Sequence, residues 1–151
     1  MPREYPNVPL VGVGAVVVRD GHVLLIRRAK PPRQGEWSLP GGLQQLGETV
    51  FEAARREVLE ETGVVIRPLA VIDVIDLIDR DRHDGRVRYH YTLIDVIAAW
   101  VSGEAVAAGD AMDVLWAERA AVGHLVVWSE TVRIIERGCR IYAAGLADEG
   151  S

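Results

Sequence analysis

The chain has 151 residues, of which 49% are hydrophobic and 26% are charged, and its formal net charge is -5 at pH 7. This length suits one domain with a buried core, and the composition is that of an ordinary soluble globular protein. The negative charge argues against a surface that coats nucleic acid, because such surfaces gather Lys and Arg around phosphates. We therefore expect a single domain over residues 1–151 and no nucleic-acid partner.

The single cysteine, Cys139, excludes an intramolecular disulfide and a cysteine-based zinc cluster. Without a histidine nearby in sequence, it is expected to be an inert packed residue. The first ten residues, MPREYPNVPL, lack the apolar core of a signal peptide, and no segment approaches the roughly 18 apolar residues of a membrane span. We expect a cytoplasmic protein with no membrane partner.

Two strands are predicted first in the chain. Residues 11–18 and 23–26 are β-branched and apolar, and the Asp20-Gly21 pair between them is a strong hairpin signal. The next stretch, AKPPRQGEWSLPGG, is rich in Pro and Gly, which favours a loop with a short strand over 36–39.

A helix is expected to begin near Thr49, because Thr49 and Glu52 have the spacing of a capping box, and to end at Gly63. Long strands follow over 64–79 and 87–101, then a short strand over 113–118 and a last helix from residue 129 to about residue 144. Interrupted strands with two helices predict an α+β fold in which the helices pack on a mixed sheet.

Two short motifs have a structural and a functional interpretation. The stretch GVGAVV, from Gly12, lacks the third glycine of a dinucleotide fingerprint and lies within a strand, so we interpret it as strand. Arg27 and Arg28 close the second strand. They are either a charged strand end or phosphate contacts, since Arg matches phosphate oxygens bidentately.

The stretch REVLEETG places Glu57, Glu60 and Glu61 within one helical turn, where like charges repel. At about 100° per residue, Glu57 and Glu61 fall inside the apolar sector of the helix and Glu60 falls on its edge. That sector contains Val50, Phe51, Ala53, Ala54 and Val58, while the solvated side contains Glu52, Arg55 and Arg56.

Partly buried carboxylates without partners are destabilising unless they take up protons or meet a cation. On the helical wheel Arg55 and Arg56 lie on the solvated side and point away from these carboxylates, so arginine is a poor candidate for the compensating cation. A hard divalent ion is favoured, because Mg²⁺ binds through one or two carboxylates together with water and substrate phosphates.

Residues 42–64 resemble the box that defines the Nudix family. The match comprises Gly42, Glu48, Arg56, Glu57, Val58, Glu60, Glu61, Gly63 and Val64 at the family's spacing. The arginine pair, the GEWSLPGG segment and a tryptophan strand after an acidic loop are also similar to Nudix enzymes. The resemblance spans roughly residues 10–120, and it implies a mixed sheet sandwiched between helices, an α/β/α sandwich.

The resemblance also implies hydrolysis of a diphosphate linked to another moiety. Glu57, Glu60 and Glu61 would hold Mg²⁺ or Mn²⁺, and the Gly41 carbonyl would add a ligand. Glu48 and Arg56 would pair to join the loop to the helix, and Gly42 and Gly63 would support the box. Cations are needed because a diphosphate repels hydroxide until its oxygens are neutralised.

Two residues are candidates for the general base that takes the proton of the attacking water. Similar enzymes often use an acid on the loop before the tryptophan strand, where this chain offers Glu104, Asp110 and Asp113, and Asp110 fits best. Many relatives carry Glu there, so Glu57 remains a rival. The implied catalytic residues are thus the three box glutamates and Asp110. Gln45, where many members carry Glu, suggests one carboxylate fewer near the metals.

The flanks look most like the bacterial ADP-ribose pyrophosphatase branch, which cuts a nucleotide sugar into AMP and a sugar phosphate. A nucleoside triphosphate hydrolase, including one for oxidised nucleotides, is the alternative, and a non-catalytic nucleotide sensor is the alternative of another class. Substrate contacts are expected from Arg27, Arg28 and Trp37. Trp37, Tyr89 or Tyr91 could stack on a base, although aromatic residues in strands are more often core. Homodimers are common among similar proteins.

Overall fold

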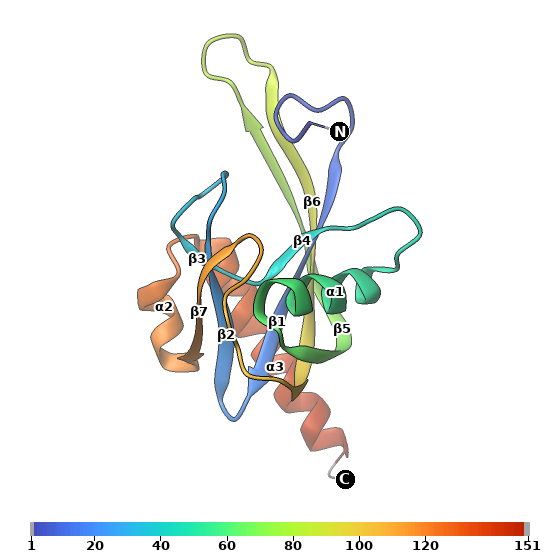
Figure 1. The fold of residues 1–151 in the computed structure, drawn as a ribbon, viewed down its shortest axis with the longest axis vertical. Coiled ribbons are helices and arrows are strands. Elements are labelled where there is room, and N and C mark those ends of the chain that lie inside the picture. The colour runs from blue at the N-terminus through green and yellow to red at the C-terminus, as the bar shows by residue number, and fades with distance from the viewer. Residues whose placement is uncertain (1, 150–151) are drawn as a thin grey trace.

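The computed structural model describes residues 2–149, with side chains through residue 145. Its elements follow in this order (Figure 1): β1 (Leu10–Arg19), β2 (His22–Arg28), β3 (Trp37–Ser38), β4 (Gly41–Leu43), α1 (Val50–Thr62), β5 (Val65–Arg80), β6 (Val87–Ser102), β7 (Ala111–Glu118), the 3-10 turn η1 (Arg119–Ala121), α2 (Val122–Leu125) and α3 (Ser129–Glu149).

The strands form one mixed sheet with the order β3-β2-β1-β6-β5, to which β4 adds beside β1 and β7 beside β2. Neighbouring strands are antiparallel except for β1 and β6, which run parallel. Asp20 and Gly21 join β1 to β2 with φ values of 48° and 75°, the left-handed pair that a tight hairpin turn requires. The predicted mixed sheet and hairpin are confirmed.

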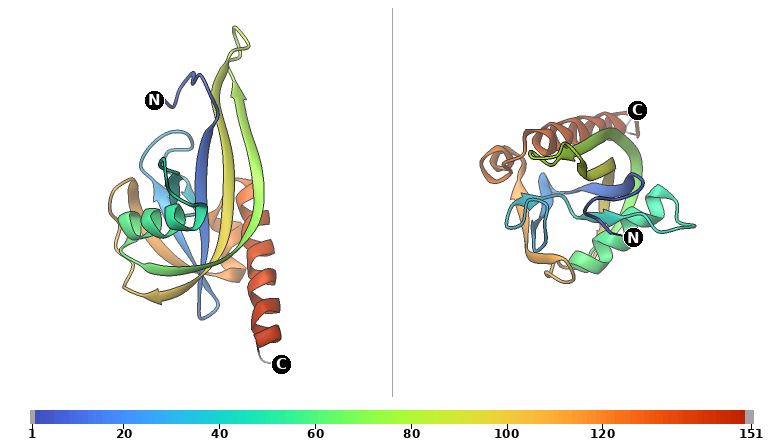
Figure 2. Two further views of the ribbon diagram at one scale, coloured as in Figure 1. Left: turned by 90° about the vertical axis from the view of Figure 1, so that its right-hand side faces the viewer. Right: turned by 90° about the horizontal axis from the view of Figure 1, so that it is seen from above.

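Helices cover both faces of the sheet (Figure 2), with α1 on one side and α3 on the other. Successive residues of β1 point to opposite faces. Val13, Ala15 and Val17 therefore pack in the core beneath α1, whereas Val16 packs in the core beneath α3. The predicted α+β fold, an α/β/α sandwich, is confirmed, and Cys139 is buried in the α3 core as expected.

The long elements lie within a residue or two of their predicted bounds, except that α3 extends to Glu149 instead of ending near residue 144. The short elements β4, η1 and α2 were not predicted. At β4 the sequence suggests a loop, yet Gly41 lies so close to β1 that an added Cβ would stand 2.2 Å from the Val13 carbonyl oxygen. Glycine there permits the close pairing.

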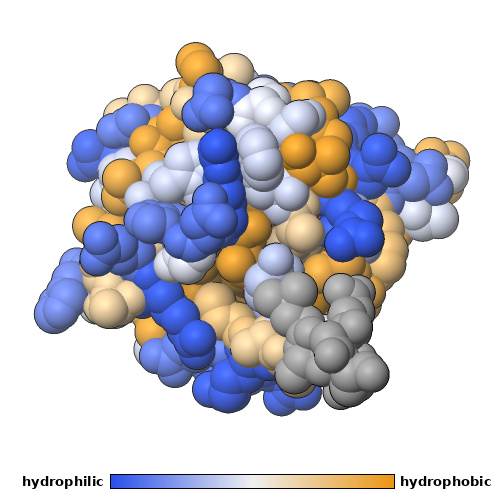
Figure 3. All heavy atoms as spheres, turned by 90° about the horizontal axis from the view of Figure 1, so that it is seen from below, coloured by the Kyte–Doolittle hydropathy of each residue, from blue (hydrophilic) through white to orange (hydrophobic). Residues whose placement is uncertain are grey.

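The β5–β6 hairpin projects beyond the rest of the sheet, with the N-terminal segment beside it (Figures 1 and 2). Tyr5 joins the two, since its hydroxyl donates to Asp81 at 2.8 Å. Figure 3 views the opposite end of the molecule, where charged and apolar side chains are interspersed. Within the described residues, none of the helices combines the length and apolar character needed to cross a membrane.

Candidate active site

Helix α1 is fixed at both ends by its own sequence. The Thr49 hydroxyl accepts from the Glu52 N–H at 3.1 Å, and the Glu52 carboxylate accepts from the Thr49 N–H at 3.4 Å, which completes the predicted capping box. Gly63 ends the helix in the left-handed conformation, with φ 74°. These two caps set where the glutamates of the helix lie relative to β4.

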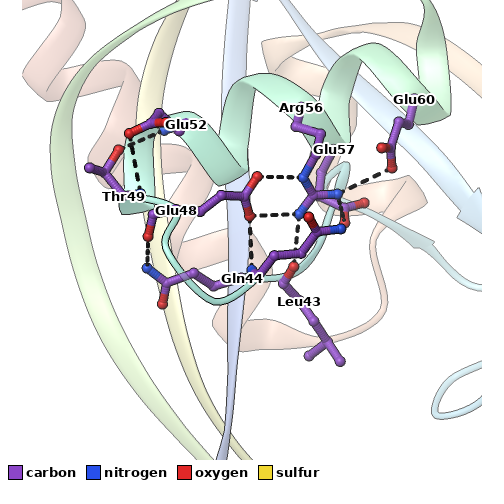
Figure 4. A network of polar contacts seen from close by, with 9 residues as sticks. Leu43, Gln44, Glu48, Thr49, Glu52, Arg56, Glu57 and Glu60 are labelled. Atoms are coloured by element: carbon purple, nitrogen blue, oxygen red, sulfur yellow. Dashed lines mark hydrogen bonds and ion pairs between the residues drawn. The ribbon is translucent and has the colours of Figure 1, made fainter.

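Glu48 and Arg56 connect the loop before α1 to the helix (Figure 4). The Arg56 guanidinium donates from Nη2 to Glu48 Oε1 at 2.9 Å and to the Leu43 carbonyl, also at 2.9 Å. Glu48 further accepts the Gln45 N–H at 2.8 Å. The Arg56 hydrogen bond and the Gln45 amide hold the pKa of Glu48 at about 2, so this carboxylate stays ionised.

The prediction that Arg56 points away from the inward-facing carboxylates is wrong. Its Nη1 atom donates to Glu57 Oε1 at 2.7 Å and to Glu60 Oε2 at 3.2 Å. A helical wheel gives only the direction of Cβ, and a side chain as long as Arg can bend back along the surface. Arg55, on the same side of the wheel, is exposed as expected.

Glu61 is the buried carboxylate of the helix, as the wheel predicted. Its side chain belongs to a residue that is only 4% exposed, and the Gly41 N–H donates to Glu61 Oε1 at 2.9 Å. The pKa of Glu61 is raised to about 7, chiefly by burial; the Gly41 amide and Arg28 oppose this shift, and the negative charges of Glu57 and Asp110 add to it. The site therefore holds negative charge that lacks full compensation.

Glu57 lies near Glu61, against the backbone of β4. A Cβ at Gly42 would stand 2.4 Å from the carboxyl carbon of Glu57, so only glycine leaves room for this carboxylate. Burial raises the pKa of Glu57, while the Arg56 hydrogen bond opposes that shift. Glu60 is different, since its side chain is 56% exposed and pairs with Arg56. Phe51, placed in the apolar sector by the wheel, is 37% exposed.

Asp110 lies on the loop that leads into β7. Lys30 pairs with it, at 2.9 Å from Nζ to Asp110 Oδ1, and the Ala29 N–H donates to the Asp110 carbonyl. A hydrogen bond from the Ala108 N–H to the Glu61 carbonyl, at 2.9 Å, joins this loop to α1, and the Asp110 charge contributes to the raised pKa values of Glu57 and Glu61. Of the other acids considered, Glu104 pairs with Arg19 instead.

The donor groups fit a hard divalent cation, although the side chains do not converge on one point. Among the residues that the structure describes, no three acidic, His or Cys side chains form a ready-made metal centre. Glu57 and Glu61 are close enough to perturb each other, whereas Glu60 is turned to Arg56. Oxygen donors, two of them in buried acids with raised pKa values, are the groups that Mg²⁺ or Mn²⁺ accepts.

A cavity of about 150 Å³ lies next to this cluster, on the α3 face of the sheet. Its walls include Gly41 and Gly42 of β4, whose backbones contact Glu61 and Glu57, and Arg28 of β2. Arg28 is the predicted substrate contact that lines the cavity. Arg27 donates to the Gly35 carbonyl and Trp37 packs against the α3 core, so neither lines it.

Asp95 and Tyr91 also line this cavity; Tyr91 is one of the rings that could stack on a base according to the sequence, whereas sequence reasoning missed Asp95 as a candidate site residue. The signal for Asp95 was a single acid inside the apolar run TLIDVIAAWV. In a strand, a lone acid usually marks the solvated face. Only the register of β1 against β6, which sets Asp95 opposite Gly14, reveals that this acid faces inward.

Comparison with known proteins identifies the class. The family model for the NUDIX domain matches residues 8–135. The chain belongs to the Nudix family.

An ADP-ribose pyrophosphatase of Methanocaldococcus jannaschii is 38% identical over 105 residues, covering 70% of this chain and 59% of the relative. A putative 8-oxo-dGTP diphosphatase 2 of Mycobacterium tuberculosis is 44% identical over 62 residues, covering 40% of this chain and 44% of the relative. The chain thus spans less than two thirds of these curated relatives. The crystal structure of a MutT NUDIX hydrolase from Burkholderia pseudomallei superposes with a TM-score of 0.69 at 29% identity, covering 87% of this chain and 98% of that one.

Proposed function

We propose that this protein is a divalent-metal-dependent hydrolase that cuts the diphosphate bond of a nucleoside diphosphate linked to another moiety. The observation that carries the proposal is the pair of carboxylates, Glu57 and Glu61, held against the backbone of β4. Both acids have raised pKa values. A cation at this point would relieve their repulsion and draw in a phosphate anion.

Glu57, Glu60 and Glu61 would hold Mg²⁺, or Mn²⁺ in its place, together with the Gly41 carbonyl. The backbone of Gly41 supports this role. Its N–H points away from β1 and donates to Glu61, and in a strand the N–H and C=O of one residue point to the same side, so the Gly41 carbonyl also faces the glutamates. When bound, the metal would neutralise phosphate oxygens and acidify a bound water. Glu60 is exposed and can leave Arg56 to join the ligands.

The chain's own residues would supply the base and bind the phosphates. Asp110 is the proposed base, because its side chain is 51% exposed to water and its charge reaches Glu57 and Glu61. Glu57 is the alternative. Arg28 is half-buried, its charge acts on Glu61, and it lines the cavity, so its guanidinium would pair with a phosphate. Arg27 and Trp37 stay predicted contacts.

ADP-ribose or a similar nucleotide sugar is our first substrate, with AMP and a sugar phosphate as products. The relative from Methanocaldococcus jannaschii, named an ADP-ribose pyrophosphatase, supports it. The alternative is a nucleoside triphosphate, including an oxidised one, which the name of the Mycobacterium tuberculosis relative supports. A nucleotide sensor without catalysis is the alternative of another class.

A substrate panel tests the proposal. Nucleotide sugars, dinucleoside polyphosphates and nucleoside triphosphates are incubated with Mg²⁺ or Mn²⁺, and products are identified by mass. We expect cleavage between phosphates that stops on chelation and in Glu61→Gln. Glu118→Gln, an exposed glutamate at the end of β7, is the matched control and should retain activity. Absence of cleavage of every substrate, with nucleotide binding intact, would favour the sensor.

A cytoplasmic location and a homodimer stay predictions of the sequence. Light scattering coupled to gel filtration measures the oligomeric state directly.

A further inference from the structure

Two residues of β6 that line the cavity, Asp95 and Tyr91, have side-chain polar groups without a hydrogen-bond partner among the described residues. Asp95 is 8% exposed, and the pKa of its carboxyl is raised to about 6 by burial and by Asp73, against an opposing effect of Arg133. No hydrogen bond within the described residues stabilises that carboxylate. The Tyr91 hydroxyl, on the same strand, is also buried without a partner among the described residues. The Asp95 oxygens are not among the fully buried atoms without a partner, so they are open to the cavity, where a ligand with a hydrogen-bond donor could bind them.

The side chain of Asp95 is aimed across β1. Asp95 lies opposite Gly14 in the parallel ladder of β1 and β6. A Cβ at Gly14 would stand 2.5 Å from Asp95 Oδ1 and 3.8 Å from the Cβ of Leu39, which also lines the cavity. Glycine at position 14 therefore makes room for the carboxylate to lie flat over the strand.

Gly12, two residues before Gly14 on the same face of β1, also makes room for a side chain of β6, because a Cβ there would stand 2.8 Å from Leu93 Cδ2. The two glycines of the GVG motif thus lie in a strand that lines the cavity, where they make room for Leu93 and Asp95, instead of forming a dinucleotide-binding turn. Leu77 and Leu93 add apolar walls.

The size and the lining of the cavity suit a heterocyclic ring. A cavity of about 150 Å³ is large enough for a ring the size of benzene, and its lining combines the apolar side chains of Leu77 and Leu93 with polar ones that include Asp95. A heterocyclic base presents apolar faces to the walls and polar atoms only at its edge, where Asp95 lies.

The cavity is also placed correctly for a nucleotide. Gly41 and Gly42 line it, and their backbones contact Glu61 and Glu57. A nucleotide with its base in the cavity would reach the glutamate cluster with its phosphates, passing Arg28.

We propose that Asp95 is a specificity-determining residue that accepts a hydrogen bond from the exocyclic amino group of the substrate's nucleobase. This inference rests on the proposed function, since it names the part of the nucleotide that selects the substrate. A carboxylate accepts hydrogen bonds from an amino group, but a keto oxygen in the same place would leave two acceptors facing each other. The protein should therefore discriminate bases by that one group.

The first test measures binding without hydrolysis. AMP, GMP and IMP contain no phosphoric anhydride and differ in their amino groups, so calorimetric dissociation constants isolate base recognition. We expect AMP or GMP to bind at least about tenfold more tightly than IMP, the effect of one hydrogen bond to a charged group. Equal binding of all three would overturn the inference.

The second test uses variants. Asp95→Asn keeps the shape but offers both a donor and an acceptor, and Asp95→Leu offers neither, so the amino preference should fall to near unity in both. Asp73→Asn is the matched control, because Asp73 faces Asp95 across β5 and β6 yet pairs with Arg133 and does not line the cavity. It should keep the preference. An amino preference that persists in both Asp95 variants, or that is lost equally in Asp73→Asn, would overturn the inference.

The kinetic readout separates this inference from the proposed function. With a substrate that the wild type hydrolyses, the Asp95 variants should raise KM and lose discrimination between amino and keto bases, with kcat nearly unchanged. A fall in kcat with the amino preference intact would overturn the specificity role. If the wild type hydrolyses no anhydride, the proposed function fails while the monophosphate titrations still decide the role of Asp95.

Discussion

The backbone N–H of Gly41 donates to the buried carboxylate of Glu61, at 2.9 Å. This one bond joins β4 to α1 and holds a glutamate in a place where its charge is poorly solvated. A single amide does not compensate a desolvated carboxylate, and the pKa of Glu61 is raised to about 7 as a result.

The free energy of unfolding of the metal-free protein should fall as pH rises from about 4.5 to about 7. In that range folded Glu61 keeps a proton that the unfolded chain has lost, so the folded state is favoured at the lower pH. The whole change is about 3 kcal/mol at most. Urea titrations over this range measure it. Glu61→Gln should flatten the slope, and an identical slope in that variant would contradict the assigned pKa of Glu61.

Gly42→Ala should reduce turnover more than it reduces stability. The added Cβ would stand 2.4 Å from the carboxyl carbon of Glu57 and would push that carboxylate out of place. Gly123→Ala is the control, because a Cβ at Gly123 meets nothing within 4 Å. We expect at least a tenfold loss of kcat/KM for Gly42→Ala and none for Gly123→Ala. Equal activity of the two variants would show that the position of Glu57 is unimportant.

Arg56→Lys should loosen the loop before α1. Lysine cannot reproduce the planar set of bonds to Glu48, Leu43 and Glu57. We expect a loss of about 1–3 kcal/mol in the free energy of unfolding, the range for hydrogen bonds to charged groups. Chemical denaturation of this variant beside Arg55→Lys, an exposed arginine, measures it. A loss no larger than that of Arg55→Lys would refute the structural role.

Asp110→Asn should lower kcat by roughly 10²–10⁴-fold, the usual contribution of a general base, and alter the pH profile of kcat. Asp113→Asn, a neighbouring exposed acid on β7, is the control. If the profile of Asp110→Asn matches the wild type, the base role passes to Glu57.

Local sequence signals predicted much of this molecule. The Thr49–Glu52 capping box and Gly63 predicted the two ends of α1, and the Asp20-Gly21 pair predicted the hairpin turn. The helical wheel predicted that Glu61 faces the core. Each of these signals depends on residues a few positions apart.

The rest depends on contacts that no local pattern encodes. The direction of Arg56 is set by Glu48, eight residues away across a loop. Asp95 becomes a cavity residue through its parallel pairing with Gly14, 81 positions earlier in the chain. Strand β4 forms because Gly41 can approach Val13, a fit that only the folded sheet reveals.

The claim that the buried carboxylate of Glu61 binds a divalent metal is tested most directly by measuring Mn²⁺ binding. Electron paramagnetic resonance at pH 8, in the absence of substrate, monitors that binding. The wild type should bind Mn²⁺, and Glu61→Gln should bind it at least about tenfold more weakly while remaining folded, because the buried carboxylate is the ligand that the neutral amide cannot replace. Glu118→Gln should bind as the wild type does. Equal Mn²⁺ affinity in the wild type and in Glu61→Gln would contradict the account.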